Sequence, residues 1–236
     1  MEFFEVVQKR RSVRKYTEKK VPEEVIEKSI RAGLIAPNSS NMQPWEFFWV
    51  RSDEMKKKIA EACLSQPAAT TASDLIVCVA RIDTWKRNQK LMLENFRRAK
   101  EAGGKIPQSA IDYYEKVIPA FYSIDPIGVT AVAKQIVLST RGIFKPTPRG
   151  PVGRKEVFEV VVKTTALACE NIMLSLVAQG YACCPMEGFD EKRLKNILRL
   201  GRNARVVMVI GAGEAHPQGL YGPQVRFDES YFVHKI

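Results

Sequence analysis

The first residues that could do chemistry form a basic cluster near the N-terminus. Arg10, Arg11, Ser12 and Arg14 place three guanidinium groups and a hydroxyl within five residues. Arginine provides paired planar donors and a permanent positive charge, and both properties suit the binding of a phosphate. A solvated basic turn has the same composition, so the cluster by itself leaves both interpretations open.

A second candidate is a polar loop between two prolines. It consists of Pro37, Asn38, Ser39, Ser40, Asn41, Met42, Gln43 and Pro44, and Trp45 follows it. An ordinary connection from a helix to a strand needs far fewer hydrogen-bonding side chains. The loop is therefore either a structured turn or a surface that holds a polar ligand.

A third candidate lies between a predicted strand and a predicted helix. It reads Pro185, Met186, Glu187 and Gly188, and Asp190 follows as the expected N-cap of the helix. A glycine at such a point permits close approach of the backbone to a flat ligand, and exposed amides near a helix start suit electron-rich atoms. An ordinary turn is the alternative.

The C-terminal segment carries a weaker signal. Gly211 and Gly213 are too few for a dinucleotide-binding fingerprint, so they predict a tight exit from a strand. Arg226, further along, is either a surface charge or one more phosphate ligand.

These candidates need a scaffold, and the hydrophobic pattern predicts one. We expect strands at 45–50, 75–80, 181–185 and 205–211, and helices at 22–36, 53–64, 155–179 and 191–200, with Ser52 and Asp190 as N-caps and Gly201 closing the last helix. A short amphipathic helix precedes Arg10. The second half of the helix at 155–179 is apolar over much of its circumference, which predicts burial in a core or an interface. Residues 85–150, with several prolines and charged helical segments, read as an excursion without a second core.

Composition narrows the function classes. The chain has 236 residues, 45% of them hydrophobic, and a formal net charge of +11, which favours anionic ligands. The basic residues are spread along the chain without a polybasic block, so a nucleic-acid-binding module is the alternative and not the first choice. Neither a signal-peptide pattern nor an apolar run of about 20 residues is evident in the sequence, so we expect a cytoplasmic protein.

Metal and thiol chemistry have little support in the sequence. The two histidines, His216 and His234, have no partner at ligand spacing, so we expect no metal. The five cysteines form no Cys-x-x-Cys pair, which indicates a reducing compartment. Cys183 and Cys184 lie on an apolar predicted strand, where inert burial is expected more than reactivity.

Taken together, the four segments resemble the nitroreductase superfamily of FMN enzymes in order and spacing over nearly the whole chain. The resemblance implies an α+β fold, a three-layer α/β/α sandwich with a mixed, mainly antiparallel sheet, a helical excursion around 85–150 and one FMN-binding domain over residues 1–236. It also implies an oxidoreductase that passes hydride from NADH or NADPH through FMN to a small planar acceptor such as a nitroaromatic or a quinone.

The resemblance further implies a role for each segment. The cofactor-binding residues are Arg10, Arg11, Ser12, Arg14, Pro37, Asn38, Ser39, Asn41, Gln43, Pro185, Met186, Glu187, Gly188 and Arg226, and the catalytic positions are Arg14, Glu187 and Gly188. Arg14 corresponds to a residue near N1 and O2 of the flavin, where positive charge stabilises the reduced form. The backbone amides at Glu187 and Gly188 correspond to groups that face N5 and O4.

The resemblance also bears on assembly and on the reaction. The loop at 37–45 in this family reaches the flavin of the other subunit, which implies a homodimer with shared active sites. Asn38 stands where serine is usual, and Gln224 stands where a lysine is common, which puts that lysine's contribution in doubt.

Ene reduction, reductive dehalogenation and flavin fragmentation use the same cofactor site, and they differ in what covers the flavin. Aromatic residues of the excursion, among them Tyr113, Tyr114, Phe121, Tyr122 and Phe144, are candidates for contacts with the acceptor.

Overall fold

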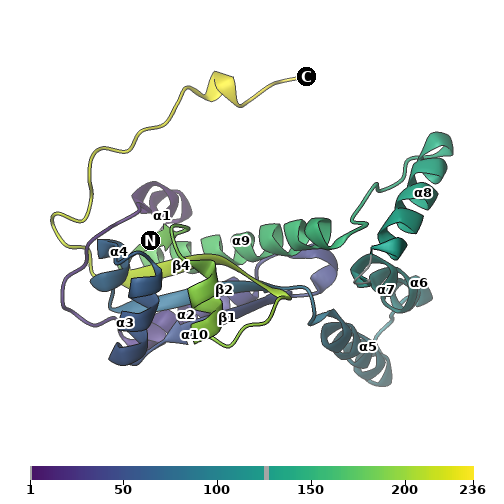
Figure 1. Ribbon diagram of the computed structural model, residues 1–236, viewed down its shortest axis with the longest axis horizontal. Helices are drawn as coiled ribbons and strands as arrows, with labels where there is room; N and C mark the ends of the chain where they lie inside the picture. The colour runs from purple at the N-terminus through teal and green to yellow at the C-terminus, as the bar shows by residue number, and fades with distance from the viewer. Residues whose placement is uncertain (1, 125–127) are drawn as a thin grey trace.

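A four-stranded sheet lies at the centre of the computed structural model, which describes residues 2–124 and 128–236 (Figure 1). Its order across the sheet is β1 (Trp45–Val50), β2 (Asp74–Arg81), β4 (Ala204–Gly213) and β3 (Ala182–Met186). All three pairings between these strands are antiparallel. Ser12 adds a parallel bridge to Cys183 at the β3 edge, so the expected mixed, mainly antiparallel sheet is confirmed.

The two inner strands explain why the sequence shows continuous apolar runs at their positions. In β2, residues 75–80 are all fully buried, because helices cover both faces of the sheet. In β4, which pairs with β2 over its length, Val206, Val209 and Ile210 are buried as well. The predicted strands each match an observed strand to within two residues at either end.

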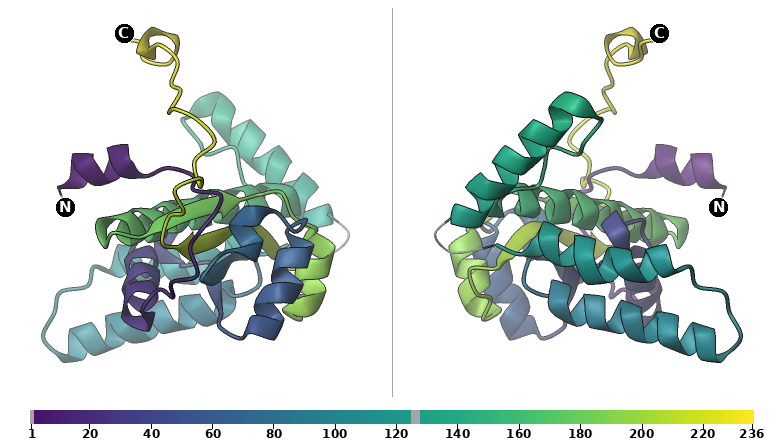
Figure 2. Two further views of the ribbon diagram at one scale, coloured as in Figure 1. Left: turned by 90° about the vertical axis from the view of Figure 1, so that its left-hand side faces the viewer. Right: turned by 90° about the vertical axis from the view of Figure 1, so that its right-hand side faces the viewer.

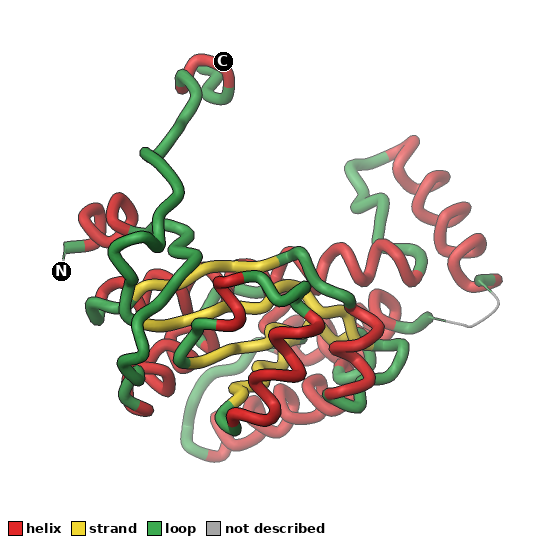
Figure 3. The backbone as a smooth tube through the Cα atoms, turned by 60° about the vertical axis from the view of Figure 1, so that its left-hand side comes forward, coloured by secondary structure: helices red, strands yellow, loops and turns green. Residues whose placement is uncertain are grey.

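Helices cover each face of the sheet, which gives the predicted three layers (Figure 3). On one face, α2 (Glu23–Leu34) and α9 (Arg154–Ala178) pack through Ile26, Ile172 and Leu176 onto Ile76 and Ile210. On the other face, α3 (Asp53–Ala62), α4 (Pro67–Thr70) and α10 (Glu191–Ile197) pack around Leu75, Val77 and Val209. No predicted helix corresponds to α4, in which only Ala68 and Ala69 are buried.

The helix ends show one correction. Ser52 Oγ accepts a hydrogen bond from Met55 N at 3.3 Å, and Asp190 Oδ1 accepts one from Arg193 N at 3.0 Å, so both predicted N-caps are confirmed. The prediction that Gly201 closes the last helix is wrong. That helix ends at Ile197. Two residues later Arg199 adopts a positive φ of 55°, and Leu200 N donates to Lys195 O at 2.7 Å. The chain has therefore already turned before it reaches the glycine.

The excursion contains α5 (Trp85–Glu101), α6 (Gln108–Asp112), the π-helical turn η2 (Tyr113–Val117), α7 (Ile118–Tyr122) and α8 (Val129–Phe144). It lies beyond one end of the sheet, and residues 125–127 within it are outside the described part (Figures 1 and 2). In the described residues its buried side chains share a cluster with the polar loop, the end of β2 and α9, as expected for an excursion without a core of its own. Tyr114, Ile118 and Tyr122 are buried in a small cluster together with Val157 and Val161 of α9.

Both ends of the chain expose apolar side chains. In α1 (Phe3–Lys9) only Val6 is buried, while Phe3 and Phe4 are exposed. Residues 220–236, which include η3 (Glu229–Tyr231), are exposed throughout and project from the body of the fold (Figure 1). By contrast, the apolar second half of α9 is mostly buried in its own chain, which confirms the predicted burial in a core, although Leu167 is 50% exposed. By length and composition α9 could cross a membrane, but here it packs along the sheet.

Candidate active site

The basic cluster lies along the β3 edge of the sheet. Arg10 is the residue that ends α1, and the chain then runs beside β3, where Val13 N donates to Cys183 O at 3.1 Å. Ser12 forms its bridge to the same residue. The sheet thus holds the backbone of 12–13 in place, between the flanking arginines.

The three arginines differ in how much of their hydrogen-bonding capacity is used. Arg11 donates to the carbonyl of Gly222 at 2.7 Å, which anchors the start of the C-terminal tail. Arg10 Nε lies 4.0 Å from the half-exposed Glu170 carboxylate, which is the outer limit of an ion pair. Arg14 is exposed, and its guanidinium lies 5.5 Å from the centre of the Tyr221 ring. Arg10 and Arg14 therefore keep donors for an anion.

The thiols on β3 are not candidates for nucleophiles. Cys183 and Cys184 are both buried. Burial raises the pKa of the Cys183 thiol to about 12, although the nearby Arg10 charge acts in the opposite direction. The thiol stays protonated at neutral pH, which agrees with the expected inert burial.

The third candidate segment is the continuation of β3 itself. Met186 is buried as the last residue of the strand, whereas Glu187 and Gly188 are exposed. The Gly188 carbonyl accepts a hydrogen bond from Gln66 Nε2 at 3.0 Å, and Asp190 N donates to Ala62 O at 2.8 Å. These two bonds hold the turn between α10 and the end of α3. The structure therefore brings the first and third segments together on one strand.

The polar loop at 37–45 is held in shape by its own side chains. Asn38 Oδ1 accepts from Gln43 N at 2.8 Å, and Asn38 Nδ2 donates to Ala36 O at 3.2 Å. Ser40, Asn41 and Gln43 all have positive φ angles, between 45° and 55°. Asparagine at 38 offers both an acceptor and a donor, and it uses both to bridge the loop, which gives a structural reason for its presence in place of serine.

The excursion holds the same loop from outside. Tyr114 Oη donates to Ser40 O at 2.5 Å, and Tyr113 Oη lies 2.6 Å from Ser40 Oγ. Asn88 of α5 is buried and donates through Nδ2 to Met42 O at 2.7 Å. These supports could not be predicted from the sequence. The only signal for them was a polar Asn88 on the face of α5 that also carries Trp85 and Met92.

Of the excursion's aromatic residues, Tyr114 and Tyr122 are 7% and 2% exposed. They pack inside the small cluster, so they are structural. Tyr113 is 39% exposed and lies beside the polar loop, which makes it the better placed of these residues for contact with a ligand.

The polar loop and the basic cluster lie at opposite edges of the sheet. The loop leads into β1, the basic cluster flanks β3, and β2 and β4 stand between them. Three interstrand spacings amount to about 14 Å across the sheet. One subunit therefore does not bring the two segments together.

Arg226 lies on the exposed tail, and its guanidinium donates to the carbonyl of its own neighbour Val225 at 2.8 Å. Gln224 is exposed as well. In the described part of the chain, two bonds anchor the start of the tail: Arg14 N donates to Gly219 O at 2.7 Å, and Arg11 donates to Gly222 O. Within the single chain Arg226 is not part of the basic cluster, and its role as a phosphate ligand stays a prediction.

The two glycines near the end of β4 have a different role from the expected strand exit. Both are within β4, and a Cβ on Gly213 would lie 2.7 Å from Cγ of the buried Tyr16. The Tyr16 hydroxyl donates to Gly211 O at 2.9 Å, and burial raises its pKa well above the ordinary value. These glycines let the segment that follows Arg14 pack onto the sheet.

The comparisons with known proteins agree with this architecture. The profile of the nitroreductase family matches residues 7–115 and 133–214. The NADH dehydrogenase of Thermus thermophilus is 35% identical over 211 residues, which cover 89% of this chain and 85% of that protein. YdgI of Bacillus subtilis, assigned as an NAD(P)H nitroreductase, is 26% identical over 92% of this chain and 90% of its own length.

Among solved structures, a protein from Exiguobacterium sibiricum, assigned as a nitroreductase and determined in complex with FMN, superposes with a TM-score of 0.72. It is 22% identical, and the match covers 100% of this chain and 98% of that one. The sheet order, the three layers and the match of the family profile over most of the sequence lead to one assignment. The chain belongs to the nitroreductase family and is an oxidoreductase of that family.

Proposed function

We propose that this protein binds FMN and passes hydride from NADH or NADPH to a small planar acceptor, such as a nitroaromatic compound or a quinone. The observation that carries the proposal is the placement of Arg10 and Arg14 beside the same strand that ends at the exposed Glu187 and Gly188. Cations for a phosphate and a backbone turn open to a flat ring thus lie along one sheet edge.

The donor set at this edge fits FMN. Arg10 and Arg14 have charges with no carboxylate closer than 4.0 Å in the described part of the chain, so an anionic group would complete them. When bound, FMN would supply the chemistry of accepting and delivering hydride. Arg10 and Arg226 would hold the phosphate, Arg14 would place its charge beside the ring, and the amides of Glu187 and Gly188 would face the edge where charge develops.

We further propose a homodimer with shared sites, formed by single domains that span residues 1–236. The opposite placement of the polar loop and the basic cluster supports this, because a second copy could supply the loop that one subunit lacks. Exposed apolar side chains support it as well. Phe3, Phe4, Phe227, Tyr231 and Phe232 are each more than 60% exposed, which is unusual for aromatic residues of a stable monomer. The proposal places the enzyme in the cytoplasm.

The test combines cofactor binding with assembly. Purified protein is titrated with FMN, assayed for oxidation of NADH and NADPH with candidate acceptors, and sedimented over a range of dilutions while flavin absorbance is followed. We expect ping-pong kinetics, and we expect dimer and flavin to be lost together on dilution. Absence of FMN binding would refute the proposal, and a monomer that keeps its flavin and its turnover would refute the shared site.

Variants separate the roles within the site. Arg10→Ala and Arg226→Ala should each weaken the binding of FMN by about 1.5–3 kcal/mol, the value of a charge-assisted hydrogen bond. Arg14→Ala should in addition lower the reduction potential of the flavin. Asn41→Ala should weaken FMN without loss of the subunit fold, since the residue is exposed. Equal losses in all the arginine variants with an unchanged potential would contradict the assignment.

A further inference from the structure

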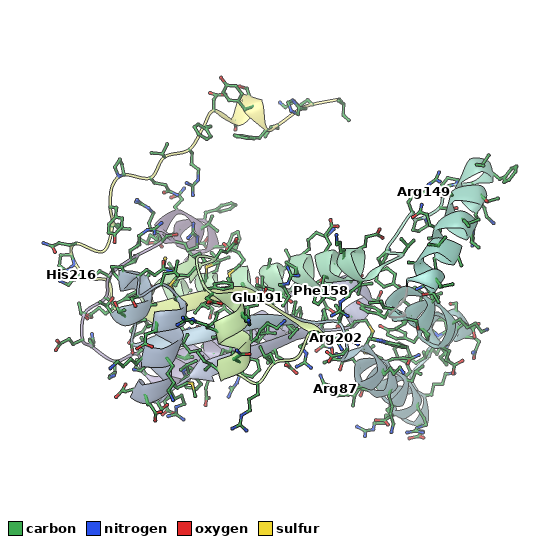
Figure 4. The ribbon with its side chains drawn as sticks, viewed as in Figure 1. Arg87, Arg149, Phe158, Glu191, Arg202 and His216 are labelled. Atoms are coloured by element: carbon green, nitrogen blue, oxygen red, sulfur yellow. The ribbon has the colours of Figure 1, made fainter. Side chains whose placement is uncertain are left out.

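A cavity lies between the sheet and the excursion, at the N-terminal end of α9. Its volume is about 1470 Å³, and its lining includes Trp85, Tyr122, Arg154, Phe158, Arg202 and Arg205. Figure 4 shows Phe158 and Arg202 in this region, where the end of the sheet meets the excursion. None of these residues belongs to the predicted FMN site.

This cavity is also far from the basic cluster at the β3 edge. It lies at the Ala204 end of β4, whereas Arg10 to Arg14 flank Cys183, which pairs with Ala212 near the other end. At about 3.4 Å per strand residue, these ends are about 25 Å apart. Within one chain, a ligand in the cavity would therefore lie apart from the basic cluster that is proposed to hold the FMN phosphate.

The charge of the described lining residues is strongly positive. Among them, Lys86, Lys155 and Lys195 line the cavity together with the three arginines, against two acids, Asp83 and Glu159. Both acids already face cations outside the lining: Asp83 accepts from Arg81 at 2.9 Å, and Glu159 lies 3.6 Å from Lys163. In the described part of the chain, Arg154, Arg202 and Lys155 form no salt bridge with a carboxylate. The cavity therefore keeps an excess of positive charge.

One phenyl ring holds two of the guanidinium groups in place. The guanidinium carbons of Arg154 and Arg205 each lie 5.2 Å from the centre of Phe158, whose side chain is almost fully buried. Arg154 is fixed further, since it donates to Asn203 Oδ1 at 2.9 Å and to Arg202 O at 2.5 Å. Only Arg205 has a carboxylate neighbour, Glu191 at 3.4 Å. Two guanidinium groups are thus fixed beside one ring in the lining, where a multivalent anion would find positive charge already in place.

The lining of the cavity also contains aromatic residues. Trp85 and the buried Tyr122 stack with ring centres 6.3 Å apart and an angle of 21°, and Lys86 lies 5.6 Å from the centre of the Trp85 ring. Trp85 is partly exposed. A flat ring could therefore rest against Trp85.

We propose that this cavity binds a compound with several adjacent phosphates, at a site distinct from that of FMN. Arg154, Arg202 and Arg205 bind the phosphates. Inorganic polyphosphate and a nucleoside polyphosphate share this chemistry, and Trp85 distinguishes them, because only a nucleoside has a ring to lie against it.

The test is calorimetric titration of the full chain with inorganic tripolyphosphate and with ATP, in the presence and absence of excess FMN. We expect saturable binding of at least one of the two that weakens with salt and does not change when FMN is added. Arg202→Gln and Arg205→Gln should each weaken it about tenfold, as expected for loss of a charge-assisted contact. Arg31→Gln, an equally cationic and exposed change on α2, is the matched control and should have no effect.

The outcomes separate cleanly. Absence of saturable binding of both compounds, competition with FMN, or an equal effect of Arg31→Gln would overturn the proposal, whether or not FMN itself binds. Tighter binding of ATP than of tripolyphosphate, reduced to the same value by Trp85→Ala, would identify a nucleotide site. Equal binding of the two, unaffected by Trp85→Ala, would identify a site for phosphates alone. The fold of Arg202→Gln should be intact, since only the backbone carbonyl of Arg202 is bonded to Arg154.

Discussion

The sheet with its covering helices and the excursion differ in how far they bury their own apolar residues. Every residue from 75 to 80 in β2 is fully buried by its own subunit. In α8, no residue is buried, although Val132, Ile136, Val137, Ile143 and Phe144 are apolar. Figure 1 shows α8 standing away from the sheet, beyond one of its ends, and Figure 2 shows the same helix from two further sides.

The difference separates the part of the chain that buries its own apolar residues from the part that leaves them exposed. The sheet and α2, α3, α9 and α10 satisfy their own apolar residues, so this part should fold as one cooperative unit. The excursion is attached through the small cluster around Tyr114 and Tyr122 and through a few hydrogen bonds to the polar loop. We expect it to open locally at a lower free energy than global unfolding.

The largest expected effect on stability comes from the same type of substitution, isoleucine to alanine, made once in each region. Ile172 of α9 is fully buried and Ile136 of α8 is 62% exposed. Ile172→Ala should lower the free energy of unfolding by about 2–5 kcal/mol, whereas Ile136→Ala should change it by less than about 0.5 kcal/mol. Urea unfolding of dilute protein measures both values. Similar losses would end the comparison, and a loss for Ile136→Ala that grows with protein concentration would show that a second copy covers α8.

A pair of glycines tests the packing inside the sheet against the freedom of the tail. Gly213→Ala pushes a methyl group against the buried Tyr16 side chain, while a Cβ on Gly222 meets nothing within 4 Å. We expect a loss of about 1–3 kcal/mol for the first and about 0.5 kcal/mol or less for the second. Thermal unfolding of the two variants is the measurement. If Gly222→Ala were the more destabilising, the tail would have contacts that the single chain does not show.

The attachment of the excursion can be weakened without touching the sheet. Tyr114→Phe removes the hydroxyl that donates to Ser40 O, which should cost about 0.5–1.5 kcal/mol. Hydrogen exchange should accelerate in the excursion and in residues 38–43, and stay unchanged in β2. Tyr113→Phe, at the more exposed neighbour, should have a smaller effect. Uniform acceleration across the whole chain would mean that the two regions unfold as one.

The smallest expected effect is a pH dependence at the surface of the sheet. The hydrogen bond from Lys19, and then that from Thr17, holds the pKa of Glu214 below its ordinary value. A carboxylate with a lowered folded pKa stabilises the fold above its unfolded pKa, about 4.3, and this contribution is lost as the pH falls through the lowered value. Glu214→Gln should lack that component of the acid-induced fall in Tm. Carboxyl NMR titration gives the pKa directly, and an unshifted Glu214 would contradict the pairing.

How far the sequence predicts this molecule depends on the range of the interactions. The strands and the N-caps at Ser52 and Asp190 follow from local patterns, so they could be placed in advance. The end of the helix that begins at Glu191 could not, because Arg199 adopts a left-handed conformation that local propensity assigns to Gly201. The pattern of small polar residues predicted a special loop at 37–45, but its attachment to Asn88 and Tyr114 needs contacts between residues that are far apart in the chain.

The candidate site shows the same limit. The sequence motifs single out Arg10, Arg14 and Gly188, and strand pairing shows that they share the β3 edge. That the polar loop belongs to the opposite edge follows only from the order of the strands. The cavity around Phe158 had no sequence signal at all, because its arginines come from separate helices and strands with unremarkable local patterns.

The polar loop has a consequence for binding kinetics. Three of its residues adopt left-handed backbone angles and Asn38 closes it with internal hydrogen bonds, so its shape is set by folding and not by a ligand. A preorganised surface loses little conformational entropy on association. Association of the loop with the flavin of a second copy should therefore be limited by diffusion and orientation, and not by a slow rearrangement of the loop. Variants at Asn38 should then lower the association rate constant more than they raise the dissociation rate constant.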